Sequence, residues 1–197
     1  MKSFFLTTLL LLAIILSLPV FGDDFSDGFE AAKKGDFKTA MKLWRPMAEQ
    51  GYPNAQFNLG LMYARGDGVP EDDKQAVKWF RLAAEQGHAS AQFGLGFMYD
   101  NGEGVPEDDK QAVKWYRLAA EQGDTTAQYN LGIMYDNGEG VPEDKVLAYM
   151  WWNLAAANGI EDASTSKGII AKRMTSSQIE KAQELSRECL KNNYKNC

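Results

Sequence analysis

The segment GDGVPEDDKQAVKWFRLAAEQG at residues 66–87 recurs as GEGVPEDDKQAVKWYRLAAEQG at residues 102–123. The copies match at 20 of 22 positions and begin 36 residues apart. They differ only at Asp67/Glu103 and Phe80/Tyr116. The same step of 36 joins Gly51, Gly87, Gly123 and Gly159. Periods of about 20 to 50 residues are typical of stacked units whose neighbours bury each other's apolar faces.

Each unit contains two amphipathic helices. Apolar residues at helical spacing mark the first helix at Ala55, Leu59, Met62 and Tyr63, and the second at Ala76, Trp79, Phe80 and Ala83. The loop between them has glycines for positive φ, a proline that cannot continue a helix, and Asp72 as the N-cap of the next helix. We therefore predict an all-α solenoid of stacked helical hairpins. The large aromatic residues that recur in the second helices are expected to fill the space between neighbouring hairpins.

The pattern extends beyond the clean copies and sets the expected boundaries. We predict an N-terminal capping hairpin at 23–52, repeats at 53–88, 89–124 and 125–159, and C-terminal capping helices at 160–197. In the third repeat Asp144 is expected to cap the second helix alone, because the following sequence has changed. Near the end, Thr175 and Gln178 form a capping box that predicts a final helix.

Residues 1–22 have the features of a secretory signal peptide. Lys2 precedes an uncharged apolar run from Phe4 to Leu18, and Pro19 ends this run. We expect cleavage before Asp23 and export to a Gram-negative periplasm or to the medium. The alternative is an uncleaved membrane anchor, but the run is shorter than the roughly 20 apolar residues that span a bilayer. No membrane insertion is expected after cleavage.

The pattern A-x-x-x-L-G-x-x-Y, a G-x-G-V-P-x-D loop and A-x-x-W-[FYW]-x-x-A-A-x-x-G resembles the Sel-one-like repeat, a relative of the tetratricopeptide repeat. The pattern occurs three times between Pro53 and about Gly159. The resemblance implies a right-handed superhelix that serves as an adaptor for other proteins and has no shared catalytic residues. Cysteine-rich relatives linked to penicillin binding carry a Cys pair in each repeat. These repeats contain no Cys, so that activity is not expected here.

Charge and the scarcity of His and Cys limit the chemistry. Acidic residues outnumber basic ones by 27 to 21, and the net charge of −6 argues against nucleic-acid partners. One His and two Cys are too few for a zinc finger or ribbon. His88 occupies the helix-start position held by Tyr52 and Asp124 in other copies, and no nucleophile or metal motif accompanies it. We predict no catalytic residue, no metal site and no cofactor.

The acidic loop with Glu103 and residues 107–109 leaves a calcium site as an alternative, because hard oxygen ligands suit that ion. Calcium loops place ligands at alternate positions and end on a bidentate Glu. Here Pro106 and the helix-capping Asp108 account for the loop, so capping and solubility are the preferred interpretation.

The first helices are expected to line a concave face that binds a protein or peptide partner. Each repeat contributes an apolar pair flanked by residues that differ between copies. The predicted binding residues are Asn54, Phe57, Leu61, Arg65, Ser90, Phe93, Phe97, Asn101, Thr126, Tyr129, Ile133 and Asn137. The alternative is that Phe57 and Phe93 are packing residues of the hairpins.

Cys189 and Cys197 lie eight residues apart after the predicted final helix. In an oxidising compartment they are expected to form a disulfide that fixes the C-terminal tail over the end of the solenoid. A reactive or intermolecular thiol is the alternative.

The sequence favours an exported, monomeric, non-enzymatic scaffold that binds a partner segment on its concave face. Two alternatives remain. One is an envelope hydrolase acting on peptidoglycan or β-lactams, and the other is a periplasmic regulator of a membrane sensor.

Overall fold

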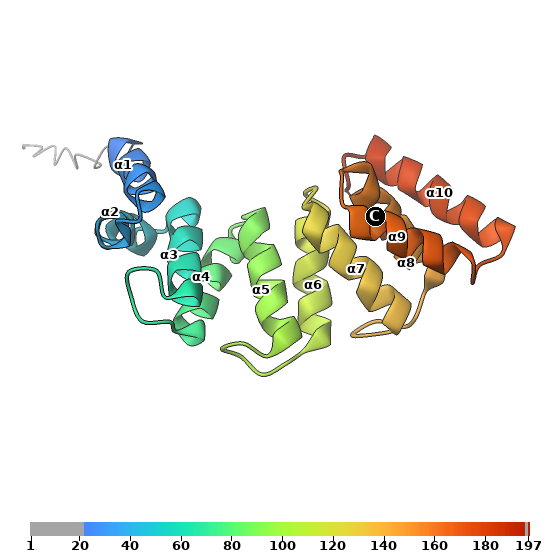
Figure 1. The fold of residues 1–197 in the computed structure, drawn as a ribbon, viewed down its shortest axis with the longest axis horizontal. Coiled ribbons are helices and arrows are strands. Elements are labelled where there is room, and N and C mark those ends of the chain that lie inside the picture. Colours follow the sequence, from blue (N-terminus) through green and yellow to red (C-terminus); the bar gives the residue numbers. More distant parts are fainter. Residues whose placement is uncertain (1–21, 196) are drawn as a thin grey trace, which may run out of the picture.

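The computed structural model describes residues 22–195 and 197, and this part of the chain folds into ten helices without strands. Their bounds are α1 Gly22–Lys33, α2 Phe37–Glu49, α3 Pro53–Arg65, α4 Asp73–Glu85, α5 Ala89–Asn101, α6 Asp109–Ala120, α7 Thr125–Asn137, α8 Lys145–Ala157, α9 Glu161–Ala171 and α10 Ser176–Lys191. The helices follow one another along an elongated molecule (Figure 1). The predicted all-α repeat fold is confirmed. The signal peptide prediction falls almost wholly outside the described residues.

Odd- and even-numbered helices alternate as the first and second helices of hairpins. Each helix from α1 to α8 packs against the next one in the chain, so contacts run from neighbour to neighbour. Asp72, Asp108 and Asp144 cap α4, α6 and α8 through their side chains, as the loop sequence predicts. Thr175 and Gln178 close the predicted capping box at the start of α10.

The loops between the two helices of a hairpin need glycine where they approach the preceding unit. Gly104 has φ +68°, and a Cβ placed on it would lie 2.4 Å from the backbone of Asp73 at the start of α4. Gly140 stands in the same relation to Asp109, with φ +67° and an approach of 2.4 Å. Any larger residue would therefore strain the loop and separate neighbouring repeats.

The core consists of apolar side chains that repeat every 36 residues. Trp79, Trp115 and Trp151 are 8%, 6% and 0% exposed, which confirms that they are packing residues. Leu59, Leu95 and Leu131 of the first helices are fully buried. Neighbouring units thus bury one another, as expected for a solenoid.

Two polar contacts also recur between units. An Arg of one second helix donates to the Tyr hydroxyl of the next first helix, in the pairs Arg45–Tyr63, Arg81–Tyr99 and Arg117–Tyr135. Buried Gln side chains donate to the carbonyl of the residue eight positions earlier, in the pairs Gln56–Ala48, Gln92–Ala84 and Gln128–Ala120. Because each bond crosses from one hairpin to the next, these contacts help to fix how far each unit rotates on its neighbour.

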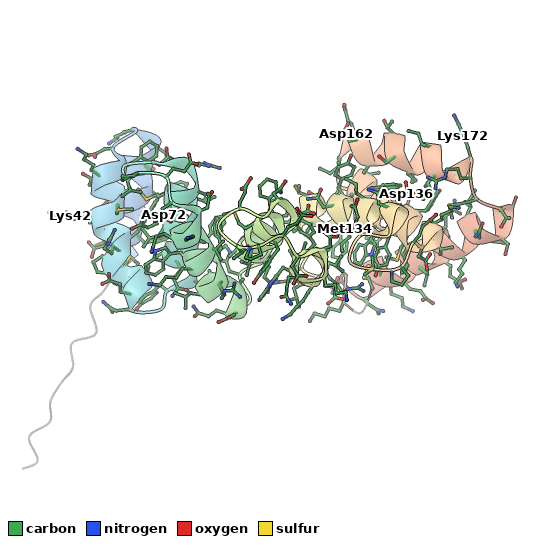
Figure 2. All side chains as sticks on the ribbon, turned by 90° about the horizontal axis from the view of Figure 1, so that it is seen from below. Lys42, Asp72, Met134, Asp136, Asp162 and Lys172 are labelled. Atoms are coloured by element: carbon green, nitrogen blue, oxygen red, sulfur yellow. A yellow bond between two sulfur atoms is a disulfide. The ribbon has the colours of Figure 1, made fainter. Side chains whose placement is uncertain are left out.

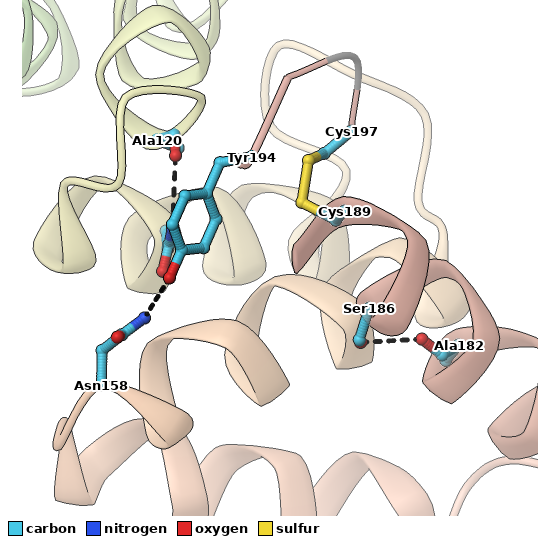
Figure 3. Close-up of a disulfide and its surroundings, with 8 residues drawn as sticks. Ala120, Asn158, Ala182, Ser186, Cys189, Tyr194 and Cys197 are labelled. Carbon is cyan, nitrogen blue, oxygen red and sulfur yellow. Dashed lines mark hydrogen bonds between the residues drawn. A yellow bond between two sulfur atoms is a disulfide. The ribbon is translucent and has the colours of Figure 1, made fainter. Parts of the chain in front are cut away.

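The C-terminal helix does not pair with α9. It packs against α8 instead, where Ala182, Ser186 and Cys189 are buried. Cys189 and Cys197 are joined in a disulfide (Figure 3). The loop that the disulfide closes contains Tyr194, whose hydroxyl accepts a hydrogen bond from Asn158 Nδ2 at 3.2 Å and whose ring lies beside the turn at Gly123. The tail therefore lies over the turns at the ends of the second and third repeats.

Candidate protein-binding surface

The first helices share a glycine that allows the second helix of the same hairpin to approach. A Cβ at Gly28, Gly60, Gly96 or Gly132 would come within 2.4, 2.5, 2.7 or 2.3 Å of Trp44, Phe80, Tyr116 or Trp152, respectively. This repeated contact places the helices in one register, including α1, whose loop is shorter. Gly168 of α9 continues the step of 36 from Gly132.

The residue after each of these glycines is apolar and reaches the surface. These residues are Phe29, Leu61, Phe97, Ile133 and Ile169, and we call them the apolar row. Phe29, Phe97 and Ile169 are 50%, 41% and 57% exposed, whereas Leu61 and Ile133 are half-buried. An apolar side chain at the same place on five successive first helices presents a regularly spaced surface rather than scattered exposed residues.

A hollow of about 520 Å³ lies along this row between α3 and α5. Six of the predicted binding residues line it, namely Phe57, Leu61, Arg65, Ser90, Phe93 and Phe97. Phe80, Gly94 and Met98 add to its apolar lining, and Glu103 and Asp124 add two carboxylates. An apolar interior with a few charged groups at the rim is the composition expected of a binding site.

The predicted residues of the third repeat lie elsewhere. Ile133 and Asn137 line a smaller hollow of about 200 Å³ with Trp152 and Ile169. Asn54, Asn101, Thr126 and Tyr129 line neither hollow. The structure thus brings the predicted residues together in two groups, of which the larger spans the first and second repeats.

Phe57 and Phe93 have two roles. The Phe57 ring lies 5.9 Å from Phe80, and the Phe93 ring lies 5.7 Å from Tyr116, so both pack within their hairpins. Both are only half-buried, and both line the larger hollow. Substituting them would disturb packing as well as the surface, whereas the more exposed Phe97 reports on the surface.

His88 is a helix cap. Its Nδ1 accepts a hydrogen bond from the Ala91 backbone N–H at 3.2 Å, and its ring stacks on Phe57 at 4.8 Å. Burial lowers the pKa of His88, which favours the neutral imidazole that can accept this bond. Within the described part of the chain, no group of three or more His, Cys, Asp or Glu side chains is placed to hold a metal ion.

Asp100 is the most perturbed carboxylate near the hollow. It accepts a hydrogen bond from the Tyr116 hydroxyl at 3.0 Å. Burial raises the pKa of Asp100, and the nearby charges of Asp109, Glu139 and Glu107 add to this rise. The surface beside the second repeat is therefore acidic, and a cationic group on a partner would be favoured there.

Two members of the apolar row, Phe29 and Ile169, are absent from the sequence-based set. Ile169 follows Ile133 by 36 residues, so the period itself was a sufficient signal. Phe29 lies outside the period because the first hairpin has a shorter loop. Its place became visible only through the contact between Gly28 and Trp44.

Comparison with known proteins identifies the repeat. The Sel1 repeat model matches residues 25–52, 53–88, 89–124 and 125–160. The chain belongs to the Sel1 repeat family. Proteins of this family generally act as scaffolds for protein interactions and typically lack enzymatic activity.

Solved Sel1 repeat structures share the fold. A Sel1 repeat protein from Oxalobacter formigenes is 30% identical, with a TM-score of 0.73 over 84% of this chain and 75% of that one. A protective antigen of uropathogenic Escherichia coli with an SLR fold is also 30% identical, with a TM-score of 0.61 over 87% of this chain and 45% of that one. Cysteine-rich protein B of Helicobacter pylori, 22% identical, has a TM-score of 0.53 over 66% of this chain and 93% of that one, which shows a likeness of fold.

One curated relative carries a functional description. An exopolysaccharide production negative regulator from Rhizobium leguminosarum bv. viciae is 43% identical over 51 residues. This match covers 26% of the present chain and only 19% of the relative.

Among residues 22–195 and 197, no helix has the length and apolar character needed to cross a bilayer.

Proposed function

We propose that this Sel1 repeat protein is an exported scaffold that holds a segment of a partner protein along its apolar row. The observation that carries the proposal is the row itself, which places one apolar side chain on each of five successive first helices. Evenly spaced apolar positions suit a regular ligand, either an extended peptide or a helix. The hollow beside Phe97 would receive a large apolar side chain of that ligand, and the acidic groups near Asp100 would favour a basic residue next to it.

Export is part of this proposal. It is supported by the signal-like residues 1–22 and by the disulfide between Cys189 and Cys197, a bond that persists in oxidising compartments.

Site-specific photo-crosslinking in the native envelope tests the binding surface. A photoreactive phenylalanine analogue at position 97 should capture a discrete partner. The same analogue at Leu118 is the matched control, because Leu118 is 37% exposed on α6, away from the row. Equal capture from both positions, or none from 97 while 118 captures a partner, would show that the row is not the binding surface.

A second candidate follows from the relative in Rhizobium leguminosarum. We propose that the partner belongs to the machinery that controls exopolysaccharide production, on the basis of the 51 matched residues. Deletion of the gene should then raise exopolysaccharide output, and a copy with Phe97→Ala should fail to restore it. Normal output in the deletion strain would rule out this role while leaving the scaffold proposal open to the crosslinking test.

A further inference from the structure

Helix α9 is a first helix without a second helix. In the four preceding hairpins the conserved register places an aromatic side chain of the second helix against a glycine of the first, in the pairs Gly28–Trp44, Gly60–Phe80, Gly96–Tyr116 and Gly132–Trp152. Gly168 occupies the same register in α9, but a Cβ placed on it would meet nothing within 4 Å. Among the described residues, the position that an aromatic side chain occupies in the other hairpins is therefore open in α9.

The other residues that the structure describes do not cover this face. Helix α10 packs against α8 rather than α9. In Figure 2, α9 forms an outer edge of the molecule, with the side chains of Asp162 and Lys172 pointing away from the body. Ser164, Thr165 and Gly168 of α9 are exposed.

Charges at the two ends of α9 define the direction of a bound helix. Glu161 and Asp162 lie in its first turn, and Lys172 and Arg173 follow its last turn. Arg173 is already paired with Asp136 at 2.9 Å, which leaves Lys172 to meet a partner. The two helices of a hairpin run antiparallel, so the N-terminus of a helix in the vacant place would lie near Lys172 and its C-terminus near Glu161. Acidic residues in its first turn and a basic residue in its last turn would complement both ends.

We infer that the open face of α9 is a docking site for an amphipathic helix of a partner protein, in the place of a missing second helix. The bound helix runs antiparallel to α9, sets an aromatic side chain on Gly168, and places small residues such as Ala three and four positions later. The direction, the aromatic residue and the small residues are taken from the four complete hairpins, whose second helices pack on the same face of α1, α3, α5 and α7. This inference does not depend on the apolar row.

A peptide from the chain itself provides a probe of the required chemistry. Residues 107–123 contain α6 with its Asp108 cap, Asp109 in the first turn, Tyr116 as the aromatic residue and Ala119–Ala120 after it. Fluorescently labelled, this peptide should bind the mature protein saturably in an anisotropy titration. The same peptide with Tyr116→Ala should bind at least about tenfold more weakly, because the aromatic contact with Gly168 is lost.

Variants of the protein locate the site. Gly168→Leu fills the slot and should weaken peptide binding by at least about tenfold. It should not unfold the protein, because a Cβ at Gly168 would meet no described atom within 4 Å and Leu favours a helix. Lys181→Leu is the matched control, since Lys181 is exposed on α10 and its replacement should leave binding unchanged. Lys172→Glu should weaken binding by repelling the acidic start of the peptide.

Two results would overturn the inference. One is a failure of the peptide to show its expected binding. This means either no saturable binding to the wild type, or equal binding to the wild type and to a Gly168→Leu variant with the same helical circular dichroism. The other is self-association of the wild-type protein in analytical ultracentrifugation that Gly168→Leu abolishes, since the occupant would then be a second copy of this chain.

Discussion

Two buried glutamines at equivalent positions should respond in opposite ways to the same substitution. The carboxamide of Gln92 is fully used, because Nε2 donates to Ala84 O at 3.1 Å and Oε1 accepts from Gln122 Nε2 at 2.7 Å. Gln128 also donates to a carbonyl, that of Ala120, but its Oε1 has no hydrogen-bond partner among the described residues, although Gln128 is 0% exposed. The Oε1 of Gln128 lacks a donor because the residue 36 positions after Gln122 is Asn158. The Asn158 side chain donates to the Tyr194 hydroxyl rather than to Gln128.

These contacts set the magnitude for Gln92→Met and Gln128→Met. Gln92→Met removes two hydrogen bonds, each of which contributes about 1 kcal/mol to stability. Burial of the Met thioether offsets part of this, so we expect the free energy of unfolding to fall by about 1–2 kcal/mol. Gln128→Met removes one bond but also relieves an unpaired buried oxygen that costs about 1–3 kcal/mol, so we expect no loss or a gain of about 1 kcal/mol. The free energies of unfolding of the two variants should therefore differ by about 1–3 kcal/mol.

Thermal unfolding followed at 222 nm measures this difference. For a chain of this size about 2–4 °C of Tm corresponds to 1 kcal/mol, so the two midpoints should lie roughly 2–12 °C apart, with Gln128→Met the higher. Because repeat proteins can unfold in parts, tryptophan fluorescence should be followed in the same samples, and coincident transitions are required for the comparison. Equal destabilisation by the two substitutions would refute the reasoning.

Three other predictions follow from single sites. Trp115→Ala should cost about 3–5 kcal/mol by removing a buried inter-hairpin side chain, and a denaturant-unfolding loss below about 1 kcal/mol would contradict this packing role. The mature protein from an oxidising compartment should have no alkylatable thiol by mass spectrometry, and two free thiols would contradict this. Replacing Cys189 and Cys197 with Ser should lower the free energy of unfolding by about 2–3 kcal/mol, since the disulfide closes a short loop. Because the pKa of Asp100 is raised, its ionisation opposes folding as pH rises through the folded pKa. Asp100→Asn, which keeps an acceptor for Tyr116, should therefore stabilise the protein at pH 7 and have little effect below the ordinary Asp pKa, as unfolding curves at several pH values would show.

The repeat was predictable because its signals are local. The step of 36, the capping Asp residues and the glycine-rich loops each depend on a few adjacent residues, and the helices begin and end close to where these signals place them. The aromatic second helices were predictable for the same reason. Gln56, Gln92 and Gln128 also recur in the sequence, but a polar residue gives no sign of burial until its carbonyl partner in the previous hairpin is known.

The arrangement of the C-terminal helices could not be predicted in this way, because it depends on a competition between two surfaces. Leu82 and Leu118 remain 38% and 37% exposed on α4 and α6, where Lys78 and Lys114 keep that face polar. On α8 the corresponding residues are Leu154, which is 0% exposed, and Met150, which is 1% exposed. Replacing Lys with Met makes this face of α8 apolar enough to bind α10, and α9 is left open as a consequence.

Two of the differences between the first and second repeats are also coupled. Phe80 of the first repeat becomes Tyr116 in the second, and a buried hydroxyl needs a partner. The position that supplies it changes at the same time, from Ala64 to Asp100, and the two side chains are hydrogen-bonded at 3.0 Å. One paired change therefore preserves the packing of the hairpin while introducing a carboxylate beside the apolar row. In the third repeat, Asp136 occupies the same position but is paired with Arg173. Each repeat thus presents an apolar residue of the row with a different neighbour, namely a neutral Ala64, the carboxylate of Asp100 or the ion-paired Asp136. This variation would allow the row to distinguish the two directions of a bound segment.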